Sequence, residues 1–195
     1  MIDNRLLREN SRRQLGGSLF GNDWLIMAVV CFVYSAVLGA LSGTLIGVIL
    51  VGGPLAYGLC RVLIGAVNGK KFDFNDILSG FTEAFGNSVV LSLLQALFIA
   101  LWSMLFIVPG IIKSYSYAMA MYIQQDDPTK EAKVCIDESR QMMDGYKWQL
   151  FCLDFSFIGW YLLGSLCFGV GIFLVVPYHQ MARTNFYLAL KAGAI

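Results

Sequence analysis

Charged residues are scarce in this chain, and they are missing from three of its expected turns. Asp, Glu, Lys and Arg together make up 14% of the 195 residues, and the mean hydropathy is +0.65. This composition leaves too little polar surface to cover a soluble fold. A net charge of +1 also excludes the strongly basic field that nucleic-acid binding usually needs. We therefore expect no nucleic-acid partner.

Residues with familiar catalytic or metal-binding chemistry are few as well. There is one histidine, His179, and the five cysteines form no C-x-x-C pair. We expect no metal site and no cofactor, and we interpret the cysteines as small buried hydrophobes. The sequence contains no G-x-S-x-G elbow, H-E-x-x-H helix or phosphate loop, so we expect no enzyme. A hydrogen-bonded structural role is the simpler interpretation of His179, and a proton relay is the alternative.

The main feature of the sequence is a series of long apolar segments. About 20 residues of helix cross a hydrocarbon core of ~30 Å, and a backbone in lipid must be helical to satisfy its own hydrogen bonds. The chain is therefore predicted to be an all-α polytopic membrane bundle, one domain over residues 1–195, with about six transmembrane helices in three hairpins. The predicted spans are about 24–42, 45–67, 87–108, 110–125, 148–167 and 171–190. The fourth is short and polar, so either neighbours cover it or it only dips into the membrane.

The basic residues predict the orientation. They precede the first span, follow the second, lie between the fourth and fifth, and follow the sixth. The turns on the other side carry no charge; they lie around Ser42–Thr44, Pro109–Gly110 and Phe168–Gly171. By the positive-inside rule, both termini are cytoplasmic and the protein lies in the cell membrane. Lys113 is the exception, near the outer end of the fourth span.

Three polar segments show helical patterning. Residues 3–15 set three leucines against four arginines. Residues 73–85 and 128–145 place apolar side chains at helical spacing, with Asp73 and Asp127 as expected N-caps and Gly145 as a stop. We expect all three to be amphipathic helices on the cytoplasmic interface, facing anionic lipid headgroups. For the first, an ordinary solvated helix is an equal alternative.

This layout indicates an internal repeat. Each unit has an amphipathic helix, a glycine joint, an apolar span and a returning span with a proline (Pro54, Pro109 or Pro177). The predicted units are 1–67, 68–126 and 127–191. Such repeats often bind something at their interface, but they are also a way to enlarge a bundle.

Ionisable residues inside a span are costly, so they are candidates for function. Arg61, Asp154 and Arg183 are predicted at about the same depth below the cytoplasmic surface, where Asp154 could pair with both arginines. The simpler interpretation is a salt bridge that joins three helices. The alternative is a positively charged pocket that opens to the cytoplasm and suits a phosphate or carboxylate. Lys113, His179 and Tyr178 are the other intramembrane polar candidates.

Several strings resemble a known family. Residues 105–117 read LFIVPGIIKSYSY, and residues 155–160 read FSFIGW. Ser139 with Met142–Gly145 and Pro177–Tyr178 with Phe186–Tyr187 complete the pattern. Together they resemble bacterial integral membrane proteins grouped as domain of unknown function 975. This resemblance implies a multi-pass membrane protein without an assigned activity. The chain is also distantly similar to the membrane region of bacterial glycerophosphodiester phosphodiesterases, which implies an association with lipid. It departs from the family at Asp144, where a basic residue is usual.

Three functions compete. The first is a non-catalytic membrane protein that binds lipid or a membrane-protein partner. The second is a small transporter, permease or exporter accessory subunit. The third is a membrane-embedded enzyme that acts on lipid through Asp154 and His179, whose predicted depths are too different for the two to meet. The residues available at the candidate sites, rather than the fold, favour these functions in that order.

Overall fold

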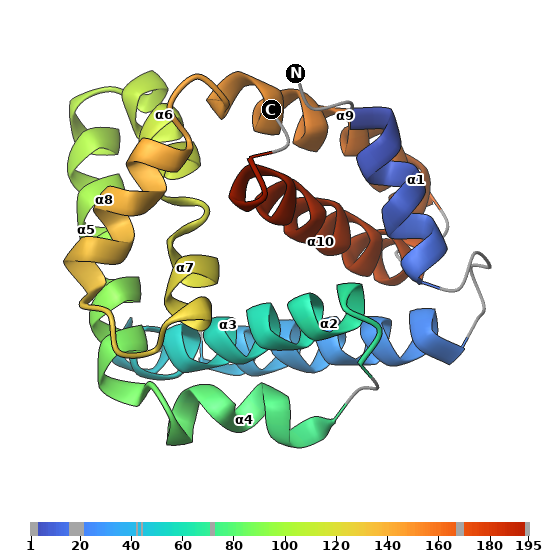
Figure 1. The fold of residues 1–195 in the computed structure, drawn as a ribbon, viewed down its shortest axis with the longest axis horizontal. Helices are drawn as coiled ribbons and strands as arrows, with labels where there is room; N and C mark the ends of the chain where they lie inside the picture. The colour runs from blue at the N-terminus through green and yellow to red at the C-terminus, as the bar shows by residue number, and fades with distance from the viewer. Residues whose placement is uncertain are drawn as a thin grey trace. The chain divides into compact units, whose positions relative to one another are not determined.

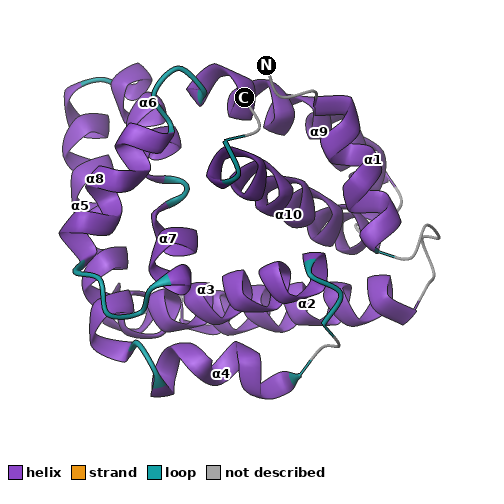
Figure 2. Ribbon diagram, viewed as in Figure 1, coloured by secondary structure: helices purple, strands orange, loops and turns teal. Residues whose placement is uncertain are grey.

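The structure is a computed structural model that describes residues 4–15, 22–41, 43, 45–70, 73–166 and 170–193. Every regular element among these residues is a helix (Figures 1 and 2). The helices are α1 (Asn4–Gln14), α2 (Asn22–Leu41), α3 (Leu45–Val67), α4 (Phe74–Thr82), α5 (Phe85–Leu105), α6 (Ile107–Tyr117), α7 (Ala120–Asp126), α8 (Ala132–Met142), α9 (Lys147–Leu166) and α10 (Val170–Lys191). The all-α class is confirmed, and five of the six predicted spans coincide closely with α2, α3, α5, α9 and α10. Parts of the outer turns at 42–44 and 168–171 lie outside the described residues.

The predicted fourth span, 110–125, is not one helix. α6 ends at Tyr117 and α7 begins at Ala120. At ~1.5 Å per residue, the 11 residues of α6 reach only about 16 Å, roughly half of a hydrocarbon core. A single continuous helix over 110–125 is therefore wrong.

Side chains from two other helices stabilise the break between α6 and α7. The hydroxyl of Ser139, on α8, accepts a hydrogen bond from the Met119 amide at 3.2 Å and donates one to the Ser116 carbonyl at 2.8 Å. Gln95, on α5, donates to the Tyr117 carbonyl at 2.8 Å. Backbone groups released by the interrupted helix are thus paired from outside it.

Each predicted amphipathic segment contains a short helix, α1, α4 or α8. Asp73 caps α4 as predicted, accepting from the Asn75 amide at 3.0 Å. Asp127 does not cap α8, which begins only at Ala132. Its carboxylate instead accepts from the amide and hydroxyl of Thr129, in a turn before the helix. Gly145 adopts φ +80°, as expected of a stop just beyond a helix.

These three helices use different packing faces. The apolar stripe of α8 is buried as predicted. α4 instead buries small residues: a Cβ at Gly58 of α3 would overlap the Ile77 carbonyl, and one at Gly80 would overlap the Pro54 carbonyl. Leu78 remains exposed on α4. Close backbone contact between α3 and α4 therefore outweighs burial of the α4 apolar stripe.

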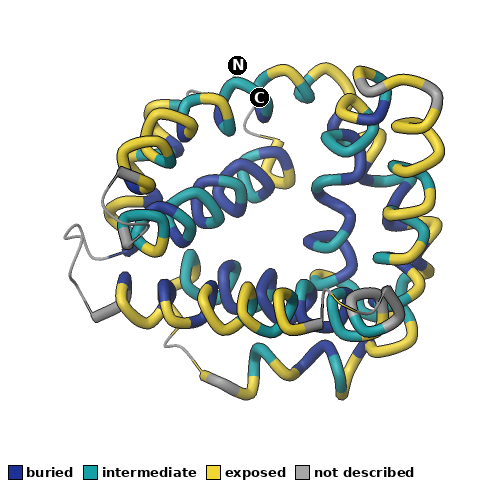
Figure 3. Tube along the Cα trace, turned by 180° about the vertical axis from the view of Figure 1, so that it is seen from behind, coloured by how far each residue is buried: buried dark blue, intermediate teal, exposed yellow. Residues whose placement is uncertain are grey.

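The chain divides into two compact units. The first comprises Met1–Ala36, Leu63–Phe72 and Trp148–Ile195; the second comprises Val37–Val62 and Asp73–Lys147. In the first unit, α1 packs on α10, where Asn185 donates to Ser11 at 2.9 Å and to Gln14 at 2.7 Å. In the second, α8 packs on α5, α6 and α7. Figure 3 shows buried stretches on α10 and α7 and long exposed stretches on α5 and α9.

Two of the described helices contain segments long and apolar enough to cross a membrane, Leu50–Val67 in α3 and Phe85–Met104 in α5. The sequence-based expectation was six. The described apolar part of α2, Trp24–Ala40, is slightly shorter, and α6 and α7 are shorter still. α9 and α10 have the length but carry Asp154, His179 and Arg183, which reduce their apolar character.

Candidate functional site

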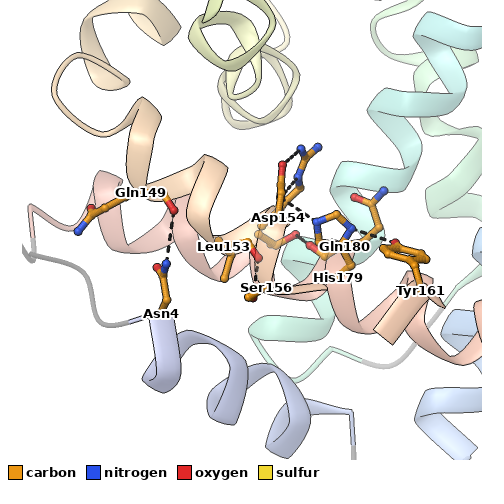
Figure 4. A network of polar contacts seen from close by, with 10 residues as sticks. Asn4, Gln149, Leu153, Asp154, Ser156, Tyr161, His179 and Gln180 are labelled. Carbon is orange, nitrogen blue, oxygen red and sulfur yellow. Dashed lines mark hydrogen bonds and ion pairs between the residues drawn. The ribbon is translucent and has the colours of Figure 1, made fainter. Parts of the chain in front are cut away.

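The candidate site is a network of four polar side chains between α9 and α10, in the first unit (Figure 4). Asp154 lies at its centre. Its Oδ1 is 2.8 Å from His179 Nε2 and 3.0 Å from Arg183 Nε, and its Oδ2 accepts a second hydrogen bond from Arg183 Nη2. On the far side of the imidazole, the Tyr161 hydroxyl is 3.0 Å from His179 Nδ1. We call Tyr161, His179, Asp154 and Arg183 the relay network.

The network is largely buried. The side chains of Asp154 and His179 are 13% and 16% exposed, and that of Arg183 is 32% exposed. The guanidinium meets the carboxylate through two nitrogens, the strong bidentate form of this pair. One arginine thus faces one carboxylate in this network, and the sequence-based alternative of a positively charged pocket stays a prediction.

Aromatic rings enclose the imidazole. The fully buried ring of Phe157 lies 4.7 Å from it, centroid to centroid, and also contacts the ring of Tyr178 at 5.0 Å. Tyr178 in turn lies 5.9 Å from Trp24, whose indole donates to the Leu174 carbonyl at 3.0 Å. The predicted candidate Tyr178 therefore belongs to the aromatic packing between α2, α9 and α10.

Arg61 takes different partners from those expected. Its Nε lies 3.2 Å from Asp76 Oδ1, and its Nη1 donates to Glu83. Asp76 is on α4, Glu83 directly follows it, and all three residues belong to the second unit. The sequence predicted that Arg61 lies at the same depth in the membrane as Asp154 and pairs with it. Its ion-pair partners are instead the acidic side chains in and directly after α4.

The separation predicted between Asp154 and His179 is wrong. Their side chains meet at 2.8 Å. Counted from the α9–α10 connection, Asp154, His179 and Arg183 lie at similar distances along two antiparallel helices. Depths estimated from the ends of the predicted spans therefore differ from the positions of these residues relative to the α9–α10 connection.

Lys113 lies apart from the relay network, on α6 of the second unit. Its ammonium is 4.8 Å from the centroid of the Trp102 ring on α5, a cation–π geometry. This contact accounts for a lysine in an apolar segment without invoking a ligand.

Sequence reasoning missed Tyr161. The chain has nine tyrosines, so a tyrosine does not by itself stand out as a candidate site residue. The signal that could have found it is helical spacing: Tyr161 follows Asp154 by two turns, so both share the face of α9 that meets α10. Among the described residues, no group of three or more His, Cys, Asp or Glu side chains could hold a metal ion. The four described cysteines are free thiols, and three of them are buried.

Comparison with known proteins gives one match. The family described as Protein of unknown function (DUF975) matches residues 106–194. No curated protein matches the chain, and no solved structure matches it. The matched region runs from just before α6 to beyond the end of α10, so it includes the whole relay network and excludes Arg61. Residues 106–194, a little under half of the chain, are thus similar to the DUF975 family.

Proposed function

We propose that this chain is a non-catalytic multi-pass protein of the cell membrane that binds anionic lipid at its cytoplasmic face. In this proposal α2, α3, α5, α9 and α10 cross the bilayer, and α6 with α7 forms a broken returning segment. Both termini and the short helices α1, α4 and α8 lie on the cytoplasmic side.

The observation that carries the proposal is an uncovered apolar stripe along α5. Its members recur every three or four residues, so they share one face of the helix. They are between 46% and 90% exposed and comprise Val90, Leu93, Leu97, Leu101 and Met104. The stripe runs over most of a helix long enough to span a membrane. A continuous apolar surface of this length would be an aggregation liability in water, whereas lipid tails cover it at no cost.

A second stripe supports the same interpretation. On α9, Phe155, Ile158 and Leu162 are exposed at helical spacing, and Trp148 is exposed near the start of the helix. A tryptophan at the end of an apolar helix is typical of the membrane–water interface. The opposite face of α9 carries the buried Leu150, Leu153 and Phe157. The helix therefore has one face for its neighbours and one suited to lipid.

The lipid-binding part of the proposal rests on α1. This helix carries four arginines against one glutamate, and Arg5, Arg12 and Arg13 are exposed while Leu7 and Ser11 are buried against the unit. Cationic side chains held near a membrane surface attract anionic headgroups, by roughly 1 kcal/mol for each Lys or Arg. α8 suits this role less well, because Lys130 pairs with Glu138 and Arg140 with Asp137.

Native mass spectrometry of the gently extracted protein tests lipid binding. We expect retained anionic lipid in the wild type and less in the variant Arg12→Gln, which is chosen because Arg13 already pairs with Glu9. Lys130→Gln is the matched control, because Lys130 already donates to Glu138 at 2.8 and 2.9 Å. That hydrogen bond also raises the pKa of the Lys130 ammonium. Equal lipid retention in both variants would contradict a role for α1, and a bare protein that carries substrate across liposomes would support a transporter.

The transporter or permease remains the second candidate, and the relay network is the observation that favours it. Ionisable side chains that meet between two membrane helices are a recurring feature of proton-coupled transport. α3 and α10 also contain internal prolines, Pro54 and Pro177, which free backbone carbonyls inside each helix.

A further inference from the structure

We infer that His179 is a proton-binding site, and that the relay network is a directional hydrogen-bond chain that takes up one proton at His179 Nδ1. This inference goes beyond the proposed function and does not depend on how many helices cross the membrane. It rests on the atoms that face the imidazole on its two sides.

Arg183 determines which groups donate and which accept along this series of hydrogen bonds. Arg183 remains protonated at any physiological pH and donates to both carboxylate oxygens of Asp154. Two donated bonds favour the ionised carboxylate, which can only accept hydrogen bonds. Oδ1 of that carboxylate also lies 2.8 Å from His179 Nε2. The Nε2 atom must therefore carry a hydrogen.

The protonation state of the opposite ring nitrogen, Nδ1, then follows as well. A neutral imidazole with hydrogen on Nε2 has a lone pair on Nδ1. The Tyr161 hydroxyl, 3.0 Å away, donates to that lone pair. Nδ1 is thus the basic atom of the network, and the Tyr161 hydroxyl is the group that covers it.

Proton uptake changes one bond direction and the charge. A proton added to Nδ1 forms an N–H bond, and the Tyr161 oxygen changes from donor to acceptor of the same hydrogen bond. The network charge rises from zero to +1. The resulting imidazolium keeps its Nε2–H bond to Asp154 and meets the face of Phe157 at 4.7 Å, both of which suit a cation. Arg183 opposes it as a like charge.

Other titratable groups of the described residues lie near the network. On α9 and α10 these are Tyr161, Asp154, Tyr178 and Arg183. α2 contributes Cys31, which is near Tyr161, and α1 contributes Arg8 and Arg12, which are near Tyr178. Asp154 is the one acidic side chain among these described groups.

His179 is the single histidine of the chain, which permits a direct test. The full-length protein, purified without a histidine tag and labelled with ¹³C,¹⁵N-histidine, gives NMR signals from this imidazole alone. In the neutral form of the imidazole we expect hydrogen on Nε2 and none on Nδ1. On acidification Nδ1 should become protonated while Nε2 stays protonated throughout. Hydrogen on Nδ1 of the neutral imidazole, or an Nε2 that loses its hydrogen within the folded range, would overturn the inference.

Three variants separate the relay from a merely structural contact. Asp154→Asn should mix the two neutral tautomers, because an amide can accept or donate at Nε2. Tyr161→Phe should keep the Nε2–H tautomer and shift only the Nδ1 resonance. Tyr178→Phe is the matched control, since Tyr178 makes an edge-to-face contact with the same Phe157 ring but donates to neither nitrogen in the relay. Imidazole signals that are identical in Tyr161→Phe and Tyr178→Phe would also overturn the inference, provided that both variants retain wild-type helix content.

Discussion

At the scale of single residues, Ser139 shows how one hydroxyl can position two helices. It is fully buried on α8, and its Oγ joins the last turn of α6 to the first residue before α7. Ser139→Ala leaves the Met119 amide without this acceptor. We expect it to lower the free energy of unfolding by about 1–3 kcal/mol, as for other buried hydrogen bonds.

Chemical denaturation in detergent, followed by circular dichroism, measures that change. Ser165→Ala is the control, because Ser165 is exposed and its hydroxyl bonds to Leu162 within its own helix. A Ser139→Ala variant as stable as the Ser165→Ala control would show that the break between α6 and α7 does not depend on α8.

Gln124 gives the opposite prediction. It is fully buried on α7, and neither polar atom of its amide has a hydrogen-bond partner among the described residues. Gln124→Met keeps the unbranched shape and removes the unpaired amide. We expect a gain of roughly 1 kcal/mol in stability, since burying an unsatisfied polar group is costly. The adjacent, less buried Gln125→Met should change little, and a loss of stability in Gln124→Met alone would indicate that a bound molecule pairs with the amide.

At this scale, the sequence predicted individual groups better than their partners. The cap at Asp73 and the pairing of Asp154 with Arg183 follow from local spacing and from two oppositely charged residues on successive helices. The partners of Arg61 did not follow, because depth along a helix does not determine which neighbouring helix faces a side chain. Tyr161 was missed because its role depends entirely on His179 across the helix pair.

At the scale of elements, glycines determine how closely α3 and α4 approach. Gly58→Ala would place a methyl group on the Ile77 carbonyl, so α4 would have to move outward. We expect a loss of stability of a few kcal/mol, similar to other overpacked sites. Thermal unfolding in detergent measures it.

Gly159→Ala is the matched control for that substitution. Gly159 also lies inside a helix, α9, and a Cβ there would meet nothing within 4 Å. Alanine favours the helix by up to about 1 kcal/mol relative to glycine, so this variant should be neutral or slightly stabilised. Equal behaviour of the two variants would contradict close packing between α3 and α4.

The boundaries of the long helices were readable from the apolar runs, but the break in the fourth was not. Residues 110–125 contain no proline or glycine near Ala118 that would end a helix there. The interruption is stabilised by Gln95 and Ser139, which are distant in the sequence. Tertiary hydrogen bonds therefore override a local preference, and no window of the sequence alone contains that information.

At the scale of the whole chain, the pairing of short and long helices follows one pattern. α4 packs on α3, and α8 packs on α6 and α7, which are the returning helices of the preceding predicted unit; α1 packs on α10, which returns in the third. α4 and α8 also contact α5. Each short helix also buries a serine: Ser11, Ser79 or Ser139. This pattern is compatible with repeat units at 1–67, 68–126 and 127–191, and the repeat remains a prediction.

In the proposed topology, α9 and α10 cross the membrane although neither is among the segments that length and composition identify. α9 and α10 each hold polar side chains that pair with one another, so their outward faces can remain apolar while their averages fall. An average over a helix counts Asp154 and Arg183 as costs even where they neutralise each other. The expectation of six crossings thus exceeds the two segments that length and composition identify.

Sided cysteine labelling tests the central claim, a multi-pass topology with cytoplasmic termini, most directly. In a variant that lacks the five native cysteines, single cysteines replace Gly43, Phe106 and Ser165 at the expected outer turns, and Lys70 and Thr129 at the expected inner segments. A membrane-impermeant maleimide applied to intact cells should label the first three positions, and the last two only after permeabilisation. Labelling of Lys70→Cys or Thr129→Cys in intact cells, or protection of all five positions until lysis, would contradict the proposed topology.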